Sequence, residues 1–307
     1  TLIHYLERSW GVSFPRGGTG ALVRGLVKLF EDIGGKLVVN AELDQILVEN
    51  AKVVGVRLKS GETLRSDLVV SNADVVHTYE KLLRGVDAAK SQTKRVKAMR
   101  PSMSLFLIYF GTNKKYPDLA HHNVIFGPRY KGLLADIFDN GTLPDDFSLY
   151  LHAPTKSDPS LAPEGHEGFY VLSPVGHLGK LKVDWKTEGP RYAEKIMAYL
   201  EERYLPGLKE SLVTQRIFTP DDFASELNAH LGSAFSSEPL LTQSAFFRTH
   251  NRDASIEGLY FAGAGTHPGA GVPGVVNSAK ATAKLVQEDF GTQADLASYV
   301  AGFQQHA

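Results

Sequence analysis

A glycine-rich run near the C-terminus constrains this chain more than any other feature. From Leu259 to Val276, a short apolar strand pattern leads into glycines spaced by small residues and two prolines, and a helix pattern follows. Glycine adopts positive φ and leaves the backbone bare, and the first N–H groups of a helix attract phosphates and polar ring edges. The run therefore predicts a strand, loop and helix that a flat or charged ligand approaches closely. A tight turn that uses glycine only for positive φ is the alternative.

The usual partner of such a loop is missing from the sequence. No G-x-G-x-x-G pattern follows a strand pattern upstream. Gly17–Gly20 has no strand before it and is better explained as a helix N-terminus that lies close to other backbone. The chain also begins at Thr1 without an initiator Met. We therefore expect one half of a nucleotide site, in the C-terminal portion of a longer protein.

Composition excludes several classes of protein. The net charge of -1 argues against nucleic acid as a partner, which requires a basic surplus. The absence of cysteine excludes disulfides, thiolate metal sites and a cysteine nucleophile, and it suits a reducing cytosol. No apolar run reaches the roughly 18 residues that a membrane-spanning helix requires. A chain of 307 residues is long enough for about two domains.

The N-terminal part of the chain is predicted to form one helix and several short strands. Gly17–Gly20 opens the helix and Gly34-Gly35 ends it. Its apolar face is formed by Leu22, Leu26, Phe30 and Ile33. Turn residues then separate strand patterns at 36–40, 45–48, 53–58 and 63–70, of which the last three predict a small antiparallel meander.

The middle and the end of the chain predict two different architectures. Strand patterns at 104–110, 147–152 and 169–172 and a helix at 190–204 indicate a mixed α+β block with an antiparallel sheet. After Gly258 the pattern becomes strand, glycine loop and helix. Val276, Ala279, Ala283 and Val286 fall on one face of that last helix, which we expect to pack against a sheet. Nucleotide-like elements thus flank the middle block, so two interleaved domains are favoured.

These residues resemble a known family. Gly263–Val275, followed by Ser278-Ala-Lys280, is similar to the C-terminal flavin motif of bacterial-type phytoene desaturases, within the amine-oxidase-like flavoprotein superfamily. The similarity extends over nearly the whole chain. The other stretches that carry it are 14–22, 71–77, 121–122, 126–130, 148–154, 241–244 and 250–253. The family's N-terminal strand, G-x-G-x-x-G and helix have no counterpart here.

The resemblance implies an FAD-dependent enzyme that removes hydrogen from adjacent carbons of a long polyene hydrocarbon, from phytoene toward lycopene. It implies a mixed α/β and α+β fold, in which a partial Rossmann-like FAD domain (17–80 and 246–307) is interleaved with a substrate domain of antiparallel sheet and helices (1–16 and 81–245). Family members act at the bilayer surface, so we expect a cytoplasmic protein peripherally associated with the inner membrane. The missing N-terminal half of the enzyme would be a partner, and this chain alone is expected to bind FAD weakly or not at all.

Carried over by position, the resemblance also implies the residues that contact the flavin. Leu43 matches an apolar position whose backbone meets the adenine, and the glycine run would line the rest of the cofactor. The expected cofactor-binding set is Leu43, Gly263, Ala264, Gly265, Thr266, His267, Pro268, Gly269, Gly271, Pro273, Gly274 and Val275. No catalytic base is evident. His267 is the candidate, against a packing or hydrogen-bonding role that we favour.

Other conspicuous side chains have plainer interpretations. His121 and His122 are adjacent and would face opposite sides of a strand, which argues against a shared metal site, and we expect no metal. His152 is interpreted as a buried, hydrogen-bonded histidine, and Arg129 with Tyr130 as a surface pair. The aromatic residues at 106–110 and 246–247 either line a hydrocarbon tunnel or belong to the core, which we favour.

Three classes of function stay open at this point. The first is the flavin-dependent desaturase, or its C-terminal portion. The second is another flavoprotein on the same fold, such as a carotenoid isomerase, an oxygenase or an amine oxidase, although no aromatic cage for an amine is recognisable. The third is a non-catalytic lipid-binding fragment, which the intact glycine run argues against.

Overall fold

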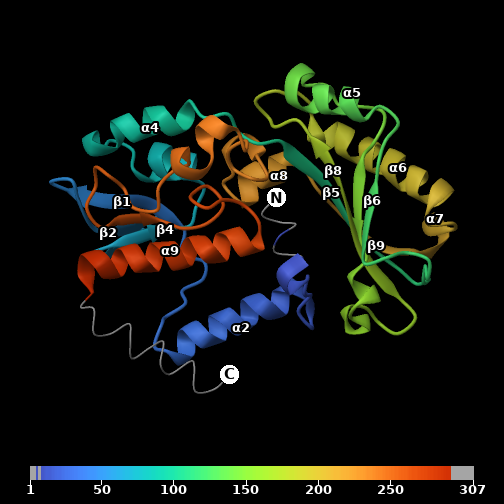
Figure 1. Cartoon of the computed structure of the whole chain (residues 1–307), viewed down its shortest axis with the longest axis horizontal. Coiled ribbons are helices and arrows are strands. Elements are labelled where there is room, and N and C mark those ends of the chain that lie inside the picture. The colour runs from blue at the N-terminus through green and yellow to red at the C-terminus, as the bar shows by residue number, and fades with distance from the viewer. Residues whose placement is uncertain (1–4, 6–7, 292–307) are drawn as a thin grey trace. The chain divides into compact units, whose positions relative to one another are not determined.

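The computed structural model describes residue 5 and residues 8–291, and the chain divides into two compact units (Figure 1). Unit 1 contains Thr1–Val39, Leu105–Val175 and Lys182–Thr219. Unit 2 contains Asn40–Ser104, Gly176–Leu181 and Pro220–Ala307. Each unit is assembled from segments distant in sequence, so the expected interleaving and mixed α/β and α+β class are confirmed. The domain boundaries inferred from the family stay a prediction.

Unit 1 is built on a five-stranded sheet in the order β6-β7-β8-β5-β9. The pairs β6/β7, β7/β8 and β5/β9 are antiparallel, as the sequence predicts for this block. The elements of unit 1 are α2 (Gly18–Asp32), β5 (Ser104–Thr112), β6 (His122–Ile125), α5 (Tyr130–Ala135), β7 (Leu149–His152), β8 (Glu167–Val175), α6 (Trp185–Arg203), α7 (Leu208–Ser211) and β9 (Leu212–Phe218).

One face of this sheet packs against α6 and forms the core of unit 1. Phe106 of β5 contacts Trp185 and Tyr192 of α6, with ring centroids 5.5 and 5.0 Å apart. Ile196 and Leu200 continue the buried stripe of the helix. Helix α6 begins five residues before the predicted start at Pro190, because the side chain of Asp184 caps it.

Gly17–Gly20 begins helix α2, as predicted, but its distant neighbours are side chains and not the expected backbone. The Gly17 amide donates a hydrogen bond to Oδ2 of Asp158 at 2.6 Å. This bond, followed by those from Ser160, lowers the pKa of the Asp158 carboxyl. The predicted apolar face of the helix forms but stays exposed, with Leu26 and Ile33 at 52% and 58%. Because a carboxylate of unit 1 already occupies the helix N-terminus, Gly17–Gly20 is no phosphate loop.

Unit 2 contains a three-stranded sheet, β1-β2-β3, and a parallel pair, β10 and β4. Its core is a cluster that includes Ile46, Tyr79, Leu83 and Phe261. The elements are β1 (Leu43–Glu49), β2 (Lys52–Leu58), β3 (Thr63–Arg65), β4 (Val69–Ser71), α3 (Val75–His77), α4 (Lys90–Lys97), α8 (Pro220–Glu226), β10 (Leu259–Phe261) and α9 (Val272–Phe290).

Two predicted strands differ in the structure. The pattern at 63–70 splits into β3 and β4, which belong to different sheets, because the chain turns at Ser66, whose hydroxyl bonds the Leu68 carbonyl. The predicted strand at 36–40 does not form, and Val38 and Val39 are 57% and 69% exposed. A strand requires a neighbour for its backbone hydrogen bonds, and no strand of the described residues pairs with this segment.

The buried face of α9 also differs from the prediction. Val276, Ala279 and Ala283 are exposed, whereas Ser278 and Thr282 are buried. The Thr282 hydroxyl donates to the Phe261 carbonyl of β10 at 2.6 Å. The helix is therefore held against β10 by polar groups that find partners there, which hydrophobic periodicity does not reveal.

Candidate functional site

The glycine run forms the loop between β10 and α9, as predicted. Gly263, Gly269 and Gly271 have φ of 115°, 134° and 95°, where other residues are strained. A Cβ atom at Gly263 would lie 2.4 Å from Asn72 Nδ2, and one at Gly274 would lie 2.6 Å from the Gly269 carbonyl oxygen. At Gly271, in contrast, nothing lies within 4 Å of a Cβ atom. Gly263 and Gly274 are thus required by close packing within the chain, whereas Gly271 leaves open space beside the start of α9.

The beginning of α9 presents backbone N–H groups that lie outside the helical hydrogen-bond pattern. Gly271 is the N-cap residue, and no side chain of the described residues caps the helix. Pro273 lies in the first two positions, where a missing N–H costs no helical hydrogen bond. The Val275 amide already bonds the Gly271 carbonyl at 2.9 Å. The positive end of a 19-residue helix therefore faces the open space at Gly271.

The buried side-chain amide of Asn251 forms hydrogen bonds that hold this loop against α9. Asn251 Nδ2 donates to Ser278 Oγ at 3.1 Å, to Thr282 Oγ1 at 3.0 Å and to the His267 carbonyl at 3.1 Å. Ser278 Oγ in turn accepts a hydrogen bond from the Gly263 amide at 3.0 Å. One side chain thus ties the loop to the first half of α9. The segment 250–253 carries part of the resemblance, but sequence reasoning gave Asn251 no role because the shared partners lie 16 to 31 residues away.

The buried, positively charged side chain of Arg248 contacts the same loop. Its Nε donates to the Thr266 carbonyl at 3.0 Å, and its Nη2 donates to the Ala264 carbonyl. In the described part of the chain, no carboxylate pairs with this guanidinium. Burial lowers the pKa of Arg248, since the charge is poorly solvated. A guanidinium without a counter-ion raises the positive potential around Gly263–Gly269. The sequence alone did not point to Arg248, because an arginine in a sequence gives no sign of whether it is buried.

A cavity of about 570 Å³ in unit 2 contains the predicted adenine contact. Leu43 lies in its wall, together with His77 and Asn72. Asn72 Nδ2 donates to the Ala262 carbonyl at 2.8 Å, so the cavity wall and the start of the glycine loop share one side chain. Asp44 also lines the cavity; hydrogen bonds from Arg57 and then Arg84 lower its pKa.

The loop's own histidine lies at the surface. His267 is exposed, its amide donates to the Thr249 carbonyl at 3.1 Å, and its carbonyl accepts from Asn251. Thr266 beside it is buried. These contacts fix the backbone of His267 and leave its ring free. Its assignment as a candidate for catalysis or flavin contact stays a prediction.

The open face of the unit 1 sheet lines a second cavity, of about 880 Å³. Aromatic rings form its wall: the centroids of Tyr150 and Tyr170 are 5.7 Å apart, and those of Tyr109 and Tyr170 are 5.9 Å apart. Burial raises the pKa of the Tyr170 phenol. Phe14 and Phe169 complete the lining. Glu167 and Arg216 also line the cavity, but most of its exposed wall is apolar and aromatic, which suits an apolar ligand.

The predictions for the remaining aromatic residues have different outcomes. Phe106 and Phe110 are 0% and 3% exposed, so the core interpretation is confirmed for them. Phe246 and Phe247 of unit 2 are 75% and 56% exposed, and the core interpretation is wrong for this pair. They sit on a short 3-10 turn without a strand or long helix to bury them. Arg129 and Tyr130 are at the surface as expected, and Arg129 is paired with Asp136 and Asp146.

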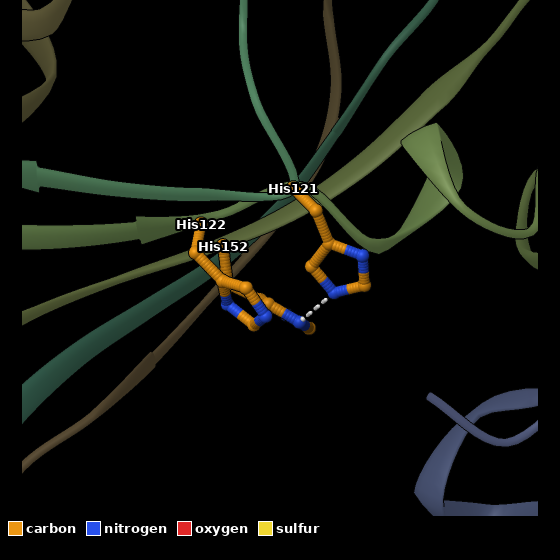
Figure 2. Close-up of side chains that lie close together, drawn as sticks. All are labelled: His121, His122 and His152. Carbon is orange, nitrogen blue, oxygen red and sulfur yellow. Dashed lines mark hydrogen bonds between the residues drawn. The ribbon is translucent and has the colours of Figure 1, made fainter. Parts of the chain in front are cut away.

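Three histidines of unit 1 meet at the rim of this cavity, contrary to the expectation for two of them (Figure 2). His122 and His152 are direct cross-strand partners of β6 and β7, so their side chains share a face. His121 precedes β6, where strand alternation does not yet apply, and its Nε2 lies 2.8 Å from His152 Nε2. The expectation that His121 and His122 face opposite sides is therefore wrong. His152 is half-buried, and burial and then the charges of His121 and His122 lower its pKa to about 4.

Comparison with known proteins places the chain in a family. Residues 1–287 match the model of the flavin containing amine oxidoreductases. The chain belongs to this family. It is 58% identical to a phytoene desaturase (lycopene-forming) of Pseudescherichia vulneris and 57% identical to one of Pantoea ananas, each over 94% of this chain and 59% of the relative. The resemblance found in the sequence is confirmed, and the chain spans about three fifths of the length of these relatives.

Fold comparison agrees with this assignment. An oxidoreductase of Methanosarcina mazei superposes with a TM-score of 0.61 at 17% identity, over 92% of this chain and 58% of that structure. The family implies FAD as the cofactor. The loop and cavity of unit 2 fit part of such a group: the space at Gly271 faces uncapped helix N–H groups, and the cavity beside Leu43 has room for a ring system.

Proposed function

We propose that this chain is the C-terminal part of an FAD-dependent desaturase that extends the conjugation of a long polyene, from phytoene toward lycopene. The observation that carries the proposal is the loop after β10: Gly271 keeps space beside the uncapped start of α9, and the network of Asn251 fixes that geometry. The names and identities of the bacterial relatives support the substrate.

The chemistry divides between cofactor and protein. Removing two hydrogens from neighbouring saturated carbons requires a hydride acceptor, which no side chain provides and which bound FAD supplies. The N–H groups at the start of α9 attract the negative charge of the cofactor. The buried guanidinium of Arg248 adds positive potential under the loop. Unit 2 thus binds and polarises the cofactor.

Unit 1 contributes the surface for the hydrocarbon. The rings of Tyr109, Tyr150 and Tyr170 present flat apolar faces that pack along a conjugated chain. A polyene carries no polar group for recognition, so contact area over such a surface supplies the affinity. Aromatic stacking thereby replaces the hydrogen-bonding pocket of an enzyme for polar substrates.

We also propose peripheral attachment to the inner membrane surface, because the substrate dissolves in lipid. Among the described residues, no helix is long and apolar enough to cross a bilayer. Flotation with phytoene-containing vesicles of anionic phospholipid tests the attachment: the protein is expected in the lipid fraction. Recovery of all protein in the lipid-free fraction would overturn this point.

The central proposal is tested by complementation. The chain is expressed alone and together with the N-terminal part of the Pantoea ananas desaturase, purified with FAD, and given phytoene in vesicles. The combined protein is expected to show flavin absorbance and to form products with longer conjugation. A combined, folded protein that retains no flavin contradicts the assignment. Flavin retention with no phytoene turnover would favour another flavoprotein activity on this fold.

A further inference from the structure

The three histidines at the cavity rim have no role in the proposed function. His121, His122 and His152 each offer a ring nitrogen, and these nitrogens lie within 4.8 Å of one another. Figure 2 shows the three rings gathered at one end of the sheet. His122 and His152 are fixed opposite each other by the strand register, and the Ala153 amide bonds the His121 carbonyl at 2.8 Å. The backbone itself thus holds the three rings together.

The contacts around the cluster orient two of the rings. His121 Nδ1 lies 2.6 Å from Ser157 Oγ, and His122 Nδ1 lies 2.6 Å from the Tyr150 hydroxyl. Each oxygen can hold the Nδ1 side of its ring, which leaves Nε2 for another partner. Outer hydrogen bonds of this type orient histidines that bind metals. At His152, Nε2 faces His121, and the buried Nδ1 has no partner among the described residues.

The spacing of the ring nitrogens suits a small metal ion. A neutral imidazole is the form that binds metal ions. A tetrahedral ion with metal–nitrogen bonds of about 2.0–2.1 Å places its ligand nitrogens about 3.3 Å apart. That spacing lies between the 2.8 Å of the His121–His152 contact and the 4.8 Å limit of the cluster, so small ring rotations complete the geometry.

We propose that His121, His122 and His152 bind one divalent transition-metal ion, with Zn²⁺ the best match. Imidazole-only sites suit zinc, copper, nickel and iron, whereas Mg²⁺ and Ca²⁺ prefer carboxylate and carbonyl oxygens. Three protein ligands leave a fourth position for water or for a ligand from the cavity, which His122 and His152 line. All three histidines belong to unit 1, whereas the glycine loop belongs to unit 2.

Titration of the tag-free chain with metal tests the proposal. The protein is dialysed against a chelator, and Zn²⁺ binding is measured by calorimetry, with Co²⁺ absorbance reporting the coordination number. One ion per chain is expected, with Co²⁺ bands of a four-coordinate site and no binding of Mg²⁺. Absence of a stoichiometric Zn²⁺ site, or equal binding of Mg²⁺, overturns the proposal.

Matched variants assign the ligands. His122→Asn removes one ligand from an exposed position and is expected to weaken Zn²⁺ binding at least about tenfold. His166→Asn is the control, because His166 lines the same cavity and bonds the Glu164 carbonyl outside the cluster. Tyr150→Phe removes the hydroxyl beside His122 and is expected to weaken binding by a smaller factor. Equal affinity of His122→Asn and His166→Asn, with folding verified by circular dichroism, would overturn the assignment.

Discussion

The two candidate regions of this molecule are built from opposite parts of the chain, one from backbone and one from side chains. In unit 2, the loop between β10 and α9 offers bare backbone, and its important side chains, Asn251 and Arg248, lie behind it. In unit 1, the cavity wall is made of side chains, with Tyr150 and Tyr170 on an otherwise regular sheet. A charged cofactor demands fixed dipoles at close range. A hydrocarbon demands only apolar area.

This contrast predicts where substitutions are tolerated. A backbone site depends on a unique loop conformation, so a buried polar change should damage folding and cofactor binding together. A side-chain site on a sheet should lose ligand affinity while the fold survives. The glycine substitutions below place one variant in each region, and the other experiments test one region at a time.

The largest effect is expected for Asn251→Leu. The substitution leaves Ser278 Oγ, Thr282 Oγ1 and the His267 carbonyl without their shared donor. Ser278 Oγ keeps the Gly263 amide and Thr282 Oγ1 keeps the Phe261 carbonyl, so the cost is that of the lost hydrogen bonds, about 0.5–1.5 kcal/mol each. We expect a loss of about 3 kcal/mol in the free energy of unfolding. Denaturant unfolding measures it. Asn277→Ala, at an exposed position of the same helix, should change it by less than about 0.5 kcal/mol. Similar losses for both variants would refute the proposed role of Asn251.

Glycine substitutions compare the two regions directly. Gly263→Ala introduces a Cβ atom 2.4 Å from Asn72 Nδ2 at a φ of 115°, and we expect a loss of about 1–3 kcal/mol. Gly168→Ala in β8 of unit 1 has nothing within 4 Å of the new atom and should be neutral within about 0.5 kcal/mol. Thermal unfolding of both variants provides the measurement. A destabilising Gly168→Ala would show that the sheet face is as constrained as the loop.

Tyr170 tests the hydrocarbon wall. In the complemented enzyme, Tyr170→Ala removes the ring that joins Tyr109 and Tyr150, and we expect a KM for phytoene about tenfold higher, equivalent to about 1.4 kcal/mol. Tyr170→Phe keeps the ring and should preserve the KM. Steady-state kinetics with vesicle-borne phytoene and unchanged flavin content distinguish the two. Should the Phe variant lose as much as the Ala variant, the hydroxyl and not the apolar face would be the important group.

The smallest effect is a pH dependence at the unit 2 cavity. Burial lowers the pKa of His77 below 6.5, although Asp74 opposes this. Between the lowered pKa and 6.5 the unfolded chain binds the proton more readily, so stability falls as pH decreases through this window. His77→Gln should reduce the difference in Tm between pH 7.5 and pH 5.5. An unchanged difference would mean that His77 is neutral or charged alike in both states.

Local sequence patterns predicted most of the helices and strands, but few of the partners against which they pack or pair. The strands around Ile46, Val53 and Phe106 follow from apolar and β-branched runs, and α2 follows from spacing and glycine stops. The failures have a common origin. Residues 36–40 have the composition of a strand but find no partner in the described chain, and the Ser66 turn divides a continuous pattern between two sheets.

The candidate sites show the same division. The glycine run identified the loop, because bare backbone before a helix has few other uses. Periodicity chose the wrong face of α9, since Ser278 and Thr282 become buried only through Asn251. The histidine cluster was missed because adjacency in sequence implied opposite faces, whereas His121 lies just before β6.

By itself, the sequence determined the family, the glycine loop between a strand and a helix, and many of the other elements, because these depend on local residue types and their spacing. Only the tertiary structure decided which glycines of the loop are closely packed and that Gly271 has open space beside it. It also decided which polar groups stabilise the loop. It also decided that three histidines from β6, β7 and the residue before β6 share one face. The physical reason is that burial and hydrogen-bond partners come from segments distant in sequence, as in the 31 residues between Asn251 and Thr282. The spacing of residue types along the sequence therefore does not reveal these partners.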